Sequence, residues 1–210
     1  MNLEKTVRFH FPKSTHITDE PRSTNEDRLM TSDVMAALGL AQAESGFGMS
    51  AFFGKLGISQ HDKNLAITGL MKLVRHKLAK VKCFDDVSGH RRGRAIYLIA
   101  LFAYEDYCRS AESPETRCKY CKGRGSVCDS ETLSKFHQRV MKPCPRCQGK
   151  GFKKVKGSGL FRAITAIMPG FSKASFYRYI FPVFEEMIQV CFKEESRADD
   201  ALKHVTRQKD

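Results

Sequence analysis

The chain has 210 residues, a mass of 23.8 kDa and 41% hydrophobic residues, which is enough for one large packed domain or two small ones and excludes a globally disordered protein. The sequence has no run of 18 apolar residues and no apolar block near its start, so we exclude a transmembrane helix and expect a cytoplasmic protein with no membrane partner. The net charge of +13 favours a polyanion as partner.

The N-terminal quarter is predicted to hold a loose tail and one helix. Residues 1–30 mix prolines, serines, threonines and charges without a clear period, so we expect a loosely ordered tail with one short strand at VRFHF. Residues 31–45, TSDVMAALGLAQAES, predict a helix that Gly46 and Gly48 end. The next stretch, GFGMSAFFGKLGIS, predicts a glycine-punctuated connector with a buried aromatic pair.

Two longer helices are predicted in the middle of the chain. The first begins at Ser59, which can accept from free N–H groups of the first turn, and its apolar face is Ile67, Leu70, Met71, Val74, Leu78 and Val81. Residues 84–94, FDDVSGHRRGR, predict a polar turn. Residues 95–111, AIYLIALFAYEDYCRSA, are apolar nearly all round, so we expect a central buried helix that Pro114 ends.

A doubled C-x-x-C-x-G-x-G motif follows this helix. Such spacing aims four sulfurs at one point and predicts one structural zinc ion with no open coordination position, held by Cys118, Cys121, Cys144 and Cys147. Glycines after each pair indicate backbone of positive φ. Two thioredoxin-like redox pairs are the alternative, but the βαβ context is missing. His137 as a replacement ligand is less favoured, because four thiols already suffice.

The remaining cysteines lie outside this motif. Cys83, Cys108 and Cys191 sit within or beside apolar stretches, so we expect packed thiols. Cys128 lies between the two copies but does not fit the ligand spacing.

The basic surplus is concentrated in one tract. Residues 132–184 contain no Asp or Glu and eleven Lys or Arg, a distribution that predicts nucleic acid as the partner rather than a merely solvated face.

The same tract contains a predicted helix-turn-helix. The tract predicts a helix over GSGLFRAITAIM, a turn at PGF and a second helix over SKASFYRYI that Pro182 interrupts. A last long helix is predicted from Val183. Ala166, Gly170 and Phe176 have the spacing of the small contact residue, the turn glycine and the apolar anchor of such a motif. We expect the inner face to be filled by Ile164, Ile167 and Phe171, and Ser172 to cap the second helix.

The second helix is the predicted DNA reader. The string SKASFYRYIFP resembles the recognition-helix segment of serine recombinase DNA-binding domains, and Arg178 is our candidate for a bidentate guanine contact. The alternative is an ordinary helical hairpin buried in the core. The predicted DNA contacts are Ser172, Lys173, Ser175, Tyr177 and Arg178, together with Arg162, Lys153, Lys154 and Lys156.

The predicted fold class is therefore mainly α, a helical bundle with a four-cysteine zinc-binding module inserted before a helix-turn-helix. We expect four segments: a tail over 1–30, a helical region over 31–113, the zinc module over 114–157, and the helix-turn-helix with the C-terminal helix over 158–210. The sequence shows no nucleophile–base pair, phosphate-binding loop or open metal site, so we expect no enzyme.

Taken together, the chain resembles the lambda-type Q antitermination proteins of lambdoid bacteriophages. The strings that carry the resemblance are SDVMAALGLAQAESGFGMSAFFGK, FAYEDYCRSA, the cysteine module and CFKEESRAD, and the match extends over nearly all of the chain. The resemblance implies a late-gene antiterminator that acts in the cytoplasm of the bacterial host cell. Such a protein binds double-stranded DNA of a late-promoter element and loads onto host RNA polymerase, so that the enzyme reads through pauses and terminators.

The resemblance also implies partners. They are the flap region of host RNA polymerase, region 4 of its sigma factor, and the elongation factor NusA. A zinc-containing chaperone module like that of DnaJ, binding unfolded polypeptide, is the alternative function; it would carry four cysteine repeats and an HPD motif, which the chain lacks. A serine recombinase fragment is the third possibility, but no catalytic half is recognisable.

Overall fold

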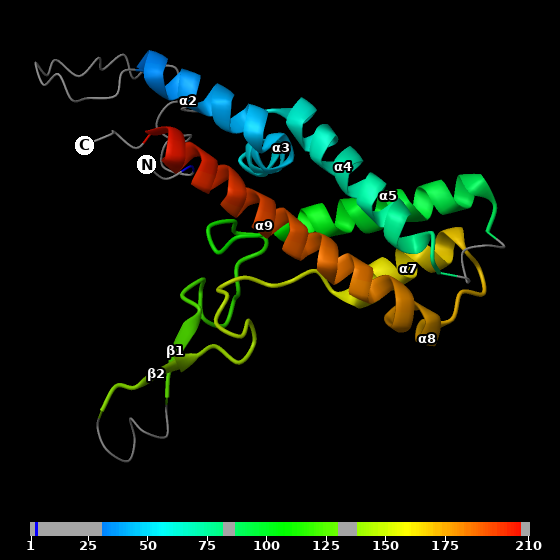
Figure 1. Cartoon of the computed structure of the whole chain (residues 1–210). Helices are drawn as coiled ribbons and strands as arrows, with labels where there is room; N and C mark the ends of the chain where they lie inside the picture. Colours follow the sequence, from blue (N-terminus) through cyan, green and yellow to red (C-terminus); the bar gives the residue numbers. More distant parts are fainter. Residues whose placement is uncertain (1–2, 4–30, 82–86, 130–137, 207–210) are drawn as a thin grey trace, which may run out of the picture. The chain divides into compact units, whose positions relative to one another are not determined.

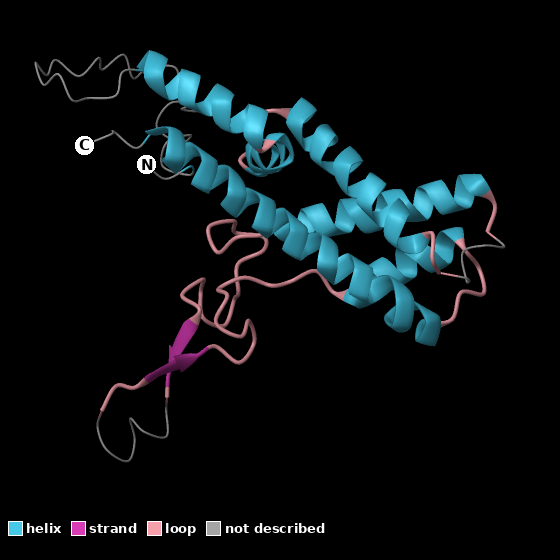
Figure 2. Cartoon of the chain, in the orientation of Figure 1, coloured by secondary structure: helices cyan, strands magenta, loops and turns pink. Residues whose placement is uncertain are grey.

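The computed structural model describes the parts of the chain that build the helices and the cysteine module. These are Leu3 and residues 31–81, 87–129 and 138–206. The predicted tail strand at VRFHF, Cys83 and His137 therefore lie outside the described residues. Within the described ranges the protein is mainly helical, as predicted, with one short two-stranded ribbon (Figure 2). None of the helices described there combines the length and the apolar character needed to span a bilayer.

The chain packs into two compact units. One unit combines Met1–Arg75 with Glu186–Asp210, and the other is His76–Glu185. Both boundaries fall inside helices, namely α4 (Gln60–Leu78) and α9 (Phe181–Thr206).

The first unit contains α2 (Thr31–Glu44), α3 (Gly46–Lys55), most of α4 and most of α9 (Figure 1). Its core joins residues from both ends of the sequence: Leu3, Val34, Ala37, Leu38, Ala41, Met49, Phe52, Ala198 and Leu202. The predicted helix over 31–45 is confirmed, with its last helical residue at Glu44.

The predicted connector after α2 is wrong, because residues 46–55 form helix α3. Gly48 lies in this helix where a Cβ would overlap the backbone carbonyl of Glu194 in α9, so the glycine serves close helix packing and not a turn. Of the predicted buried aromatic pair, Phe52 is buried and Phe53 packs, half-buried, against the same core. Gly48 therefore marks the place where α3 comes close to the backbone of α9.

Helix α4 begins as the sequence indicates. The Ser59 Oγ accepts a hydrogen bond from the backbone N–H of Asp62 at 3.1 Å, which satisfies one donor of the first turn. The predicted face is buried at Ile67, Leu70, Val74 and Leu78, while Met71 is half-buried. The helix ends at Leu78, so Val81 lies beyond it.

In the second unit, α5 (Gly89–Tyr107) begins before the predicted boundary. The segment HRRGR, predicted as part of a polar turn, forms its first turns. The helix is buried on one face and not all round, since Tyr97 is 43% exposed. It ends at Tyr107, where the N–H of Cys108 bonds to the Tyr104 carbonyl. The helix therefore ends well before Pro114.

The cysteine module supplies the short ribbon of this unit. Strands β1 (Ser126–Cys128) and β2 (Met141–Pro143) pair antiparallel, with Val127 opposite Lys142. Helix α7 (Gly157–Ile167) follows the module, as predicted, and lies beside α5 (Figure 1).

The predicted break at Pro182 does not occur. Helix α8 (Lys173–Ser175) continues through a π-helical turn, η2 (Phe176–Ile180), directly into α9. In that turn the N–H of Phe181 bonds to the carbonyl of Phe176, an i→i+5 contact. The wider turn ends just before the ring of Pro182, which has no N–H to give, and the chain passes the proline without leaving the helix.

Candidate metal centre and nucleic-acid surface

The four sulfurs of the doubled motif lie together, as the spacing predicts. Their ligand atoms are all within 4.8 Å of one another and all four residues are buried. The Sγ atoms of Cys118 and Cys144 are 3.9 Å apart, and those of Cys121 and Cys147 are 3.7 Å apart. A tetrahedron with zinc–sulfur bonds of about 2.3 Å has edges of about 3.8 Å. The donor set therefore fits one zinc ion with four thiolates and no open position.

The two copies of the motif repeat each other's backbone contacts. Within each copy the second glycine donates to the second cysteine: Gly125 N to Cys121 Sγ at 3.3 Å, and Gly151 N to Cys147 Sγ at 3.2 Å. Between the copies, the N–H of Cys118 donates to the Gly151 carbonyl at 2.8 Å, and that of Cys144 to the Gly125 carbonyl at 2.7 Å. The N–H groups aimed at sulfur stabilise thiolates, which are the forms that bind metal.

Gly125 and Gly151 are required by this arrangement. Their φ angles are +74° and +78°, as predicted for the glycines of the motif. A Cβ on Gly125 would also overlap the carbonyl oxygen of Gly149 in the other copy, and a Cβ on Gly151 would overlap that of Gly123. The two copies can approach closely enough to share one metal only because these positions lack side chains.

The thiols differ in acidity. The backbone N–H groups of Cys121 and Tyr120 lower the pKa of Cys118 to about 7, against the desolvation of the site. Desolvation raises the pKa of Cys147 to about 11. A bound cation would compensate four thiolates in this buried place. The four sulfurs form one cluster that includes contacts between the two copies, Cys118 with Cys144 and Cys121 with Cys147, which argues against two separate redox pairs.

Of the other cysteines, Cys191 is fully buried, as predicted for a packed thiol, and Cys108 is half-buried. Cys128 is exposed on β1, outside the ligand cluster.

The α7–α8 pair forms a tight helical hairpin. Gly170 has a φ of +89° in the turn, and Ser172 caps α8 by accepting from the N–H of Ser175 at 3.0 Å. The predicted anchor Phe176 is fully buried and packs edge-on against Phe161, with ring centroids 5.3 Å apart.

The predicted inner face of this hairpin is only partly right. Ile164 is fully buried, and Ile167 and Phe171 are half-buried. Ala166 is exposed, so it is not the small residue of a helix contact. At a helical repeat of 3.6 residues, the face that buries Leu160 and Ile164 turns Ala166 outward.

The predicted DNA contacts lie mostly at the surface. Ser175 is half-buried, and the guanidinium carbon of Arg178 lies 5.4 Å from the centroid of the Tyr179 ring. The other predicted contacts are exposed, as is Arg178: Ser172, Lys173, Tyr177, Arg162, Lys153, Lys154 and Lys156. The hairpin is therefore not sealed in the core, and its polar side chains can be reached by a ligand.

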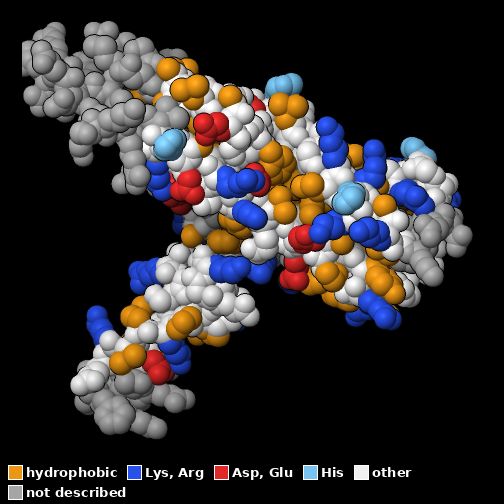
Figure 3. Space-filling model, viewed as in Figure 1, with side chains coloured by type: hydrophobic (Ala, Val, Ile, Leu, Met, Phe, Trp, Pro, Cys, Tyr) orange, Lys and Arg blue, Asp and Glu red, His pale blue; other side chains and the backbone are white. Residues whose placement is uncertain are grey.

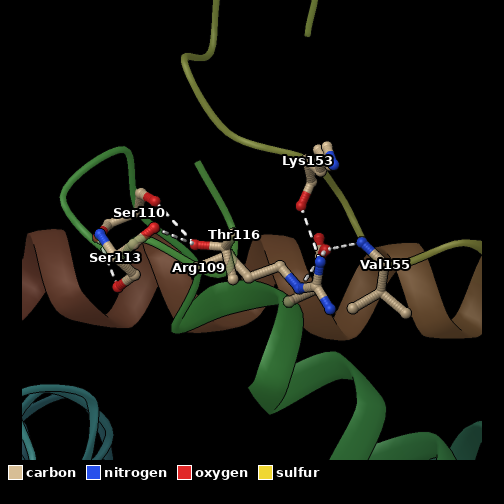
Figure 4. A network of polar contacts seen from close by, with 7 residues as sticks. Arg109, Ser110, Ser113, Thr116, Lys153 and Val155 are labelled. Atoms are coloured by element: carbon tan, nitrogen blue, oxygen red, sulfur yellow. Dashed lines mark hydrogen bonds and ion pairs between the residues drawn. The ribbon is translucent and has the colours of Figure 1, made fainter. Parts of the chain in front are cut away.

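Two residues that the sequence reasoning missed tie the module to α5. The buried carboxylate of Asp106 accepts from the N–H of Val155, and the guanidinium of Arg109 donates to the carbonyl of Lys153 at 3.0 Å (Figure 4). In the loop that enters the module, the Thr116 hydroxyl donates to the Ser110 carbonyl at 2.8 Å. The signal for Asp106 was its place, next to Glu105, among the apolar residues at the end of the predicted helix.

Comparison with known proteins gives matches over the whole chain. The family model described as antitermination protein Q matches residues 23–111 and 112–199. The chain is 41% identical over 207 residues to antitermination protein Q of Salmonella phage P22 and 40% identical to that of Escherichia phage lambda; each match covers 99% of this chain and 100% of the relative. It is 26% identical over 255 residues to the prophage antitermination protein Q homolog QuuQ of Escherichia coli strain K12.

Proposed function

The chain belongs to the antitermination protein Q family, and from this premise we propose how it works as a phage late-gene transcription antiterminator. The match over 99% of the chain confirms the resemblance and favours this function over a DnaJ-like chaperone module or a recombinase fragment. The family is a class of regulatory factors. In our proposal the protein binds late-promoter DNA and then loads onto host RNA polymerase.

The exposed basic hairpin is the single observation that carries the DNA-binding step. The end of the long α8–η2–α9 helix presents Lys173, Tyr177 and Arg178 to solvent, beside a turn fixed by Gly170 and the Ser172 cap. In the proposed complex this end enters the major groove, where Arg178 reads guanine and Lys173 holds phosphate. The lysines at 153, 154 and 156, with Arg162, add phosphate contacts.

Zinc has a structural role in this proposal. Cys118, Cys121, Cys144 and Cys147 would hold the ion, which supplies four bonds that close the module and performs no catalysis. The segment that leaves the module is held to α5 through Asp106 and Arg109, so the closed module fixes the start of the segment that carries the phosphate-binding lysines.

The proposed protein partners follow from family membership. They are the flap region of host RNA polymerase, region 4 of the sigma factor and NusA, met in the cytoplasm of the bacterial host. We assign no residues of this chain to those contacts.

A terminator read-through assay tests the proposed function. The template carries the phage's own late promoter upstream of an intrinsic terminator, and the added components are purified host polymerase with sigma factor and NusA. We expect the protein to raise the fraction of transcripts that pass the terminator, and Arg178→Ala to reduce this gain. A template with scrambled sequence at the late-promoter element is the control. Equal read-through on both templates, or none on either, would reject the DNA-dependent loading step.

A further inference from the structure

An exposed aromatic–cation pair lies on the outside of the cysteine module. Each C-x-x-C turn has one residue directly before its second cysteine: Tyr120 in the first copy and Arg146 in the second. The guanidinium carbon of Arg146 lies 5.2 Å from the centroid of the Tyr120 ring. Because the two copies repeat each other's geometry around the four sulfurs, equivalent positions are brought together on one surface.

Tyr120 lies at the surface of the module and not in its interior. Its side chain is 53% exposed, and Arg146 is exposed too, whereas Val127 packs, half-buried, against the cysteine cluster. An aromatic ring and a guanidinium are the two flat side-chain groups on which unpaired bases stack in proteins that bind single strands. The pair therefore offers a stacking surface on the exposed side of the module.

The charge around this pair suits a phosphate backbone. Residues 117–125 and 143–152, which form the two cysteine turns, contain no Asp or Glu. Their exposed basic side chains are Arg117, Lys119, Lys122, Arg124, Arg146 and Lys150. Lys and Arg side chains stand beside hydrophobic ones on the surface of the module (Figure 3). A stacking group within such a basic field is the usual composition of a site for single-stranded nucleic acid.

We propose that Tyr120 and Arg146 form a stacking platform for an unpaired base of single-stranded nucleic acid, with the neighbouring lysines and arginines holding its phosphates. This site is separate from the duplex-binding hairpin proposed above and goes beyond it. A base inside a duplex already stacks on its neighbours and cannot lie on the Tyr120 ring, so the platform selects unpaired strands. Both melted DNA and RNA have the unpaired bases and phosphates that the platform recognises.

A single engineered fluorophore tests the platform directly. The chain contains no Trp, so Tyr120→Trp introduces one reporter at the exposed position. The zinc-loaded full-length variant is titrated with a twelve-nucleotide oligo(dT) and, separately, oligo(U). Stacking of a base on the new indole predicts quenching of its emission by one or both strands, and the preferred strand identifies the source. Unchanged emission with both strands, at concentrations that saturate binding, overturns the proposal.

A matched set of variants separates stacking from charge and from folding. Tyr120→Ala is expected to weaken binding of a labelled single strand by about 5- to 150-fold in fluorescence anisotropy, and Tyr120→Phe to retain it. Tyr97→Ala removes another exposed tyrosine, on α5, and serves as the control. Zinc content and thermal unfolding of each variant check that the module is intact. Equal affinity of Tyr120→Ala and Tyr97→Ala overturns the platform.

Duplex and peptide arms complete the test. Tyr120→Ala is expected to leave binding of duplex late-promoter DNA unchanged within about twofold, since that step is assigned to the hairpin. If the protein does not bind promoter duplex but still binds the oligonucleotides, the proposed function is rejected and the stacking platform is supported. If poly-glutamate quenches the emission of the Tyr120→Trp variant and neither oligonucleotide does, the surface binds acidic protein and the proposal is wrong.

Discussion

The carboxylate of Asp106, near the end of α5, accepts a hydrogen bond from the backbone N–H of Val155, 49 residues further along the chain. Asp106 is 4% exposed, and its neighbour Arg109 donates to the carbonyl of Lys153 at 3.0 Å. One acid and one base thus bind two backbone groups of the segment that leaves the cysteine module. This clamp determines where the basic segment before α7 starts.

Removing the acceptor of the clamp is expected to destabilise the protein. Asp106→Ala leaves the N–H of Val155 without its partner in a partly buried place, so we expect the free energy of unfolding to fall by about 1–3 kcal/mol. Asp106→Asn keeps an acceptor oxygen and should lose less. The control is Asp129→Ala, which breaks the ion pair with Lys142, 50% exposed, and should change stability by less than about 1 kcal/mol. Urea unfolding measures all three; equal effects of Asp106→Ala and Asp129→Ala would contradict the clamp.

Metal content should depend on the four clustered cysteines and not on their exposed neighbour. Cys144→Ser removes one buried ligand, and we expect the purified variant to lose its zinc and the fold of residues 117–152 with it. Cys128→Ser alters a thiol that is exposed on β1 and should keep one zinc ion per chain. Elemental analysis of the two variants after dialysis measures this. Zinc retained by Cys144→Ser, or lost by Cys128→Ser, would show that the ligand set is different.

Two glycines in neighbouring helices should respond to alanine with opposite signs. Gly48→Ala places a Cβ against the carbonyl of Glu194, so α3 and α9 must shift and we expect a loss of about 1–3 kcal/mol. Gly39 lies exposed in α2 with open space around its missing Cβ, so Gly39→Ala should stabilise by about 0.5–1 kcal/mol through helix propensity. Thermal unfolding compares the pair. Equal shifts would contradict the close approach of α3 and α9.

The proposed DNA-binding hairpin predicts two kinds of loss. Arg178→Ala should weaken binding to the late-promoter element by about 1–3 kcal/mol and leave binding to unrelated duplex nearly unchanged, because it is assigned to a base edge. Lys154→Ala should weaken both to a similar extent and reduce the salt dependence of binding by about one counterion, because it is assigned to a phosphate. Gel shifts at several salt concentrations measure both effects. Equal losses on both DNAs for Arg178→Ala would make it a phosphate contact.

Local sequence patterns predicted well wherever neighbouring residues decide the structure. The cap at Ser59, the cap at Ser172 and the apolar face of α4 from Ile67 to Leu78 were confirmed, since each depends on side chains close together along one helix. The predictions that depended on glycine and proline were less accurate. Gly48 was taken as a helix stop and lies inside α3, and Pro182 was taken as a break and lies in a continuous helix.

The sequence by itself determined the cluster of four cysteines and the family, because four cysteines at fixed spacing and motifs along the whole chain are properties of the linear order. Only the tertiary structure decided why Gly48 is a glycine, how Asp106 holds Val155, and that Tyr120 meets Arg146. These contacts join residues 26 to 146 positions apart. No local propensity encodes such distances, since they arise when separate segments bury their apolar faces and must then satisfy the polar groups left between them.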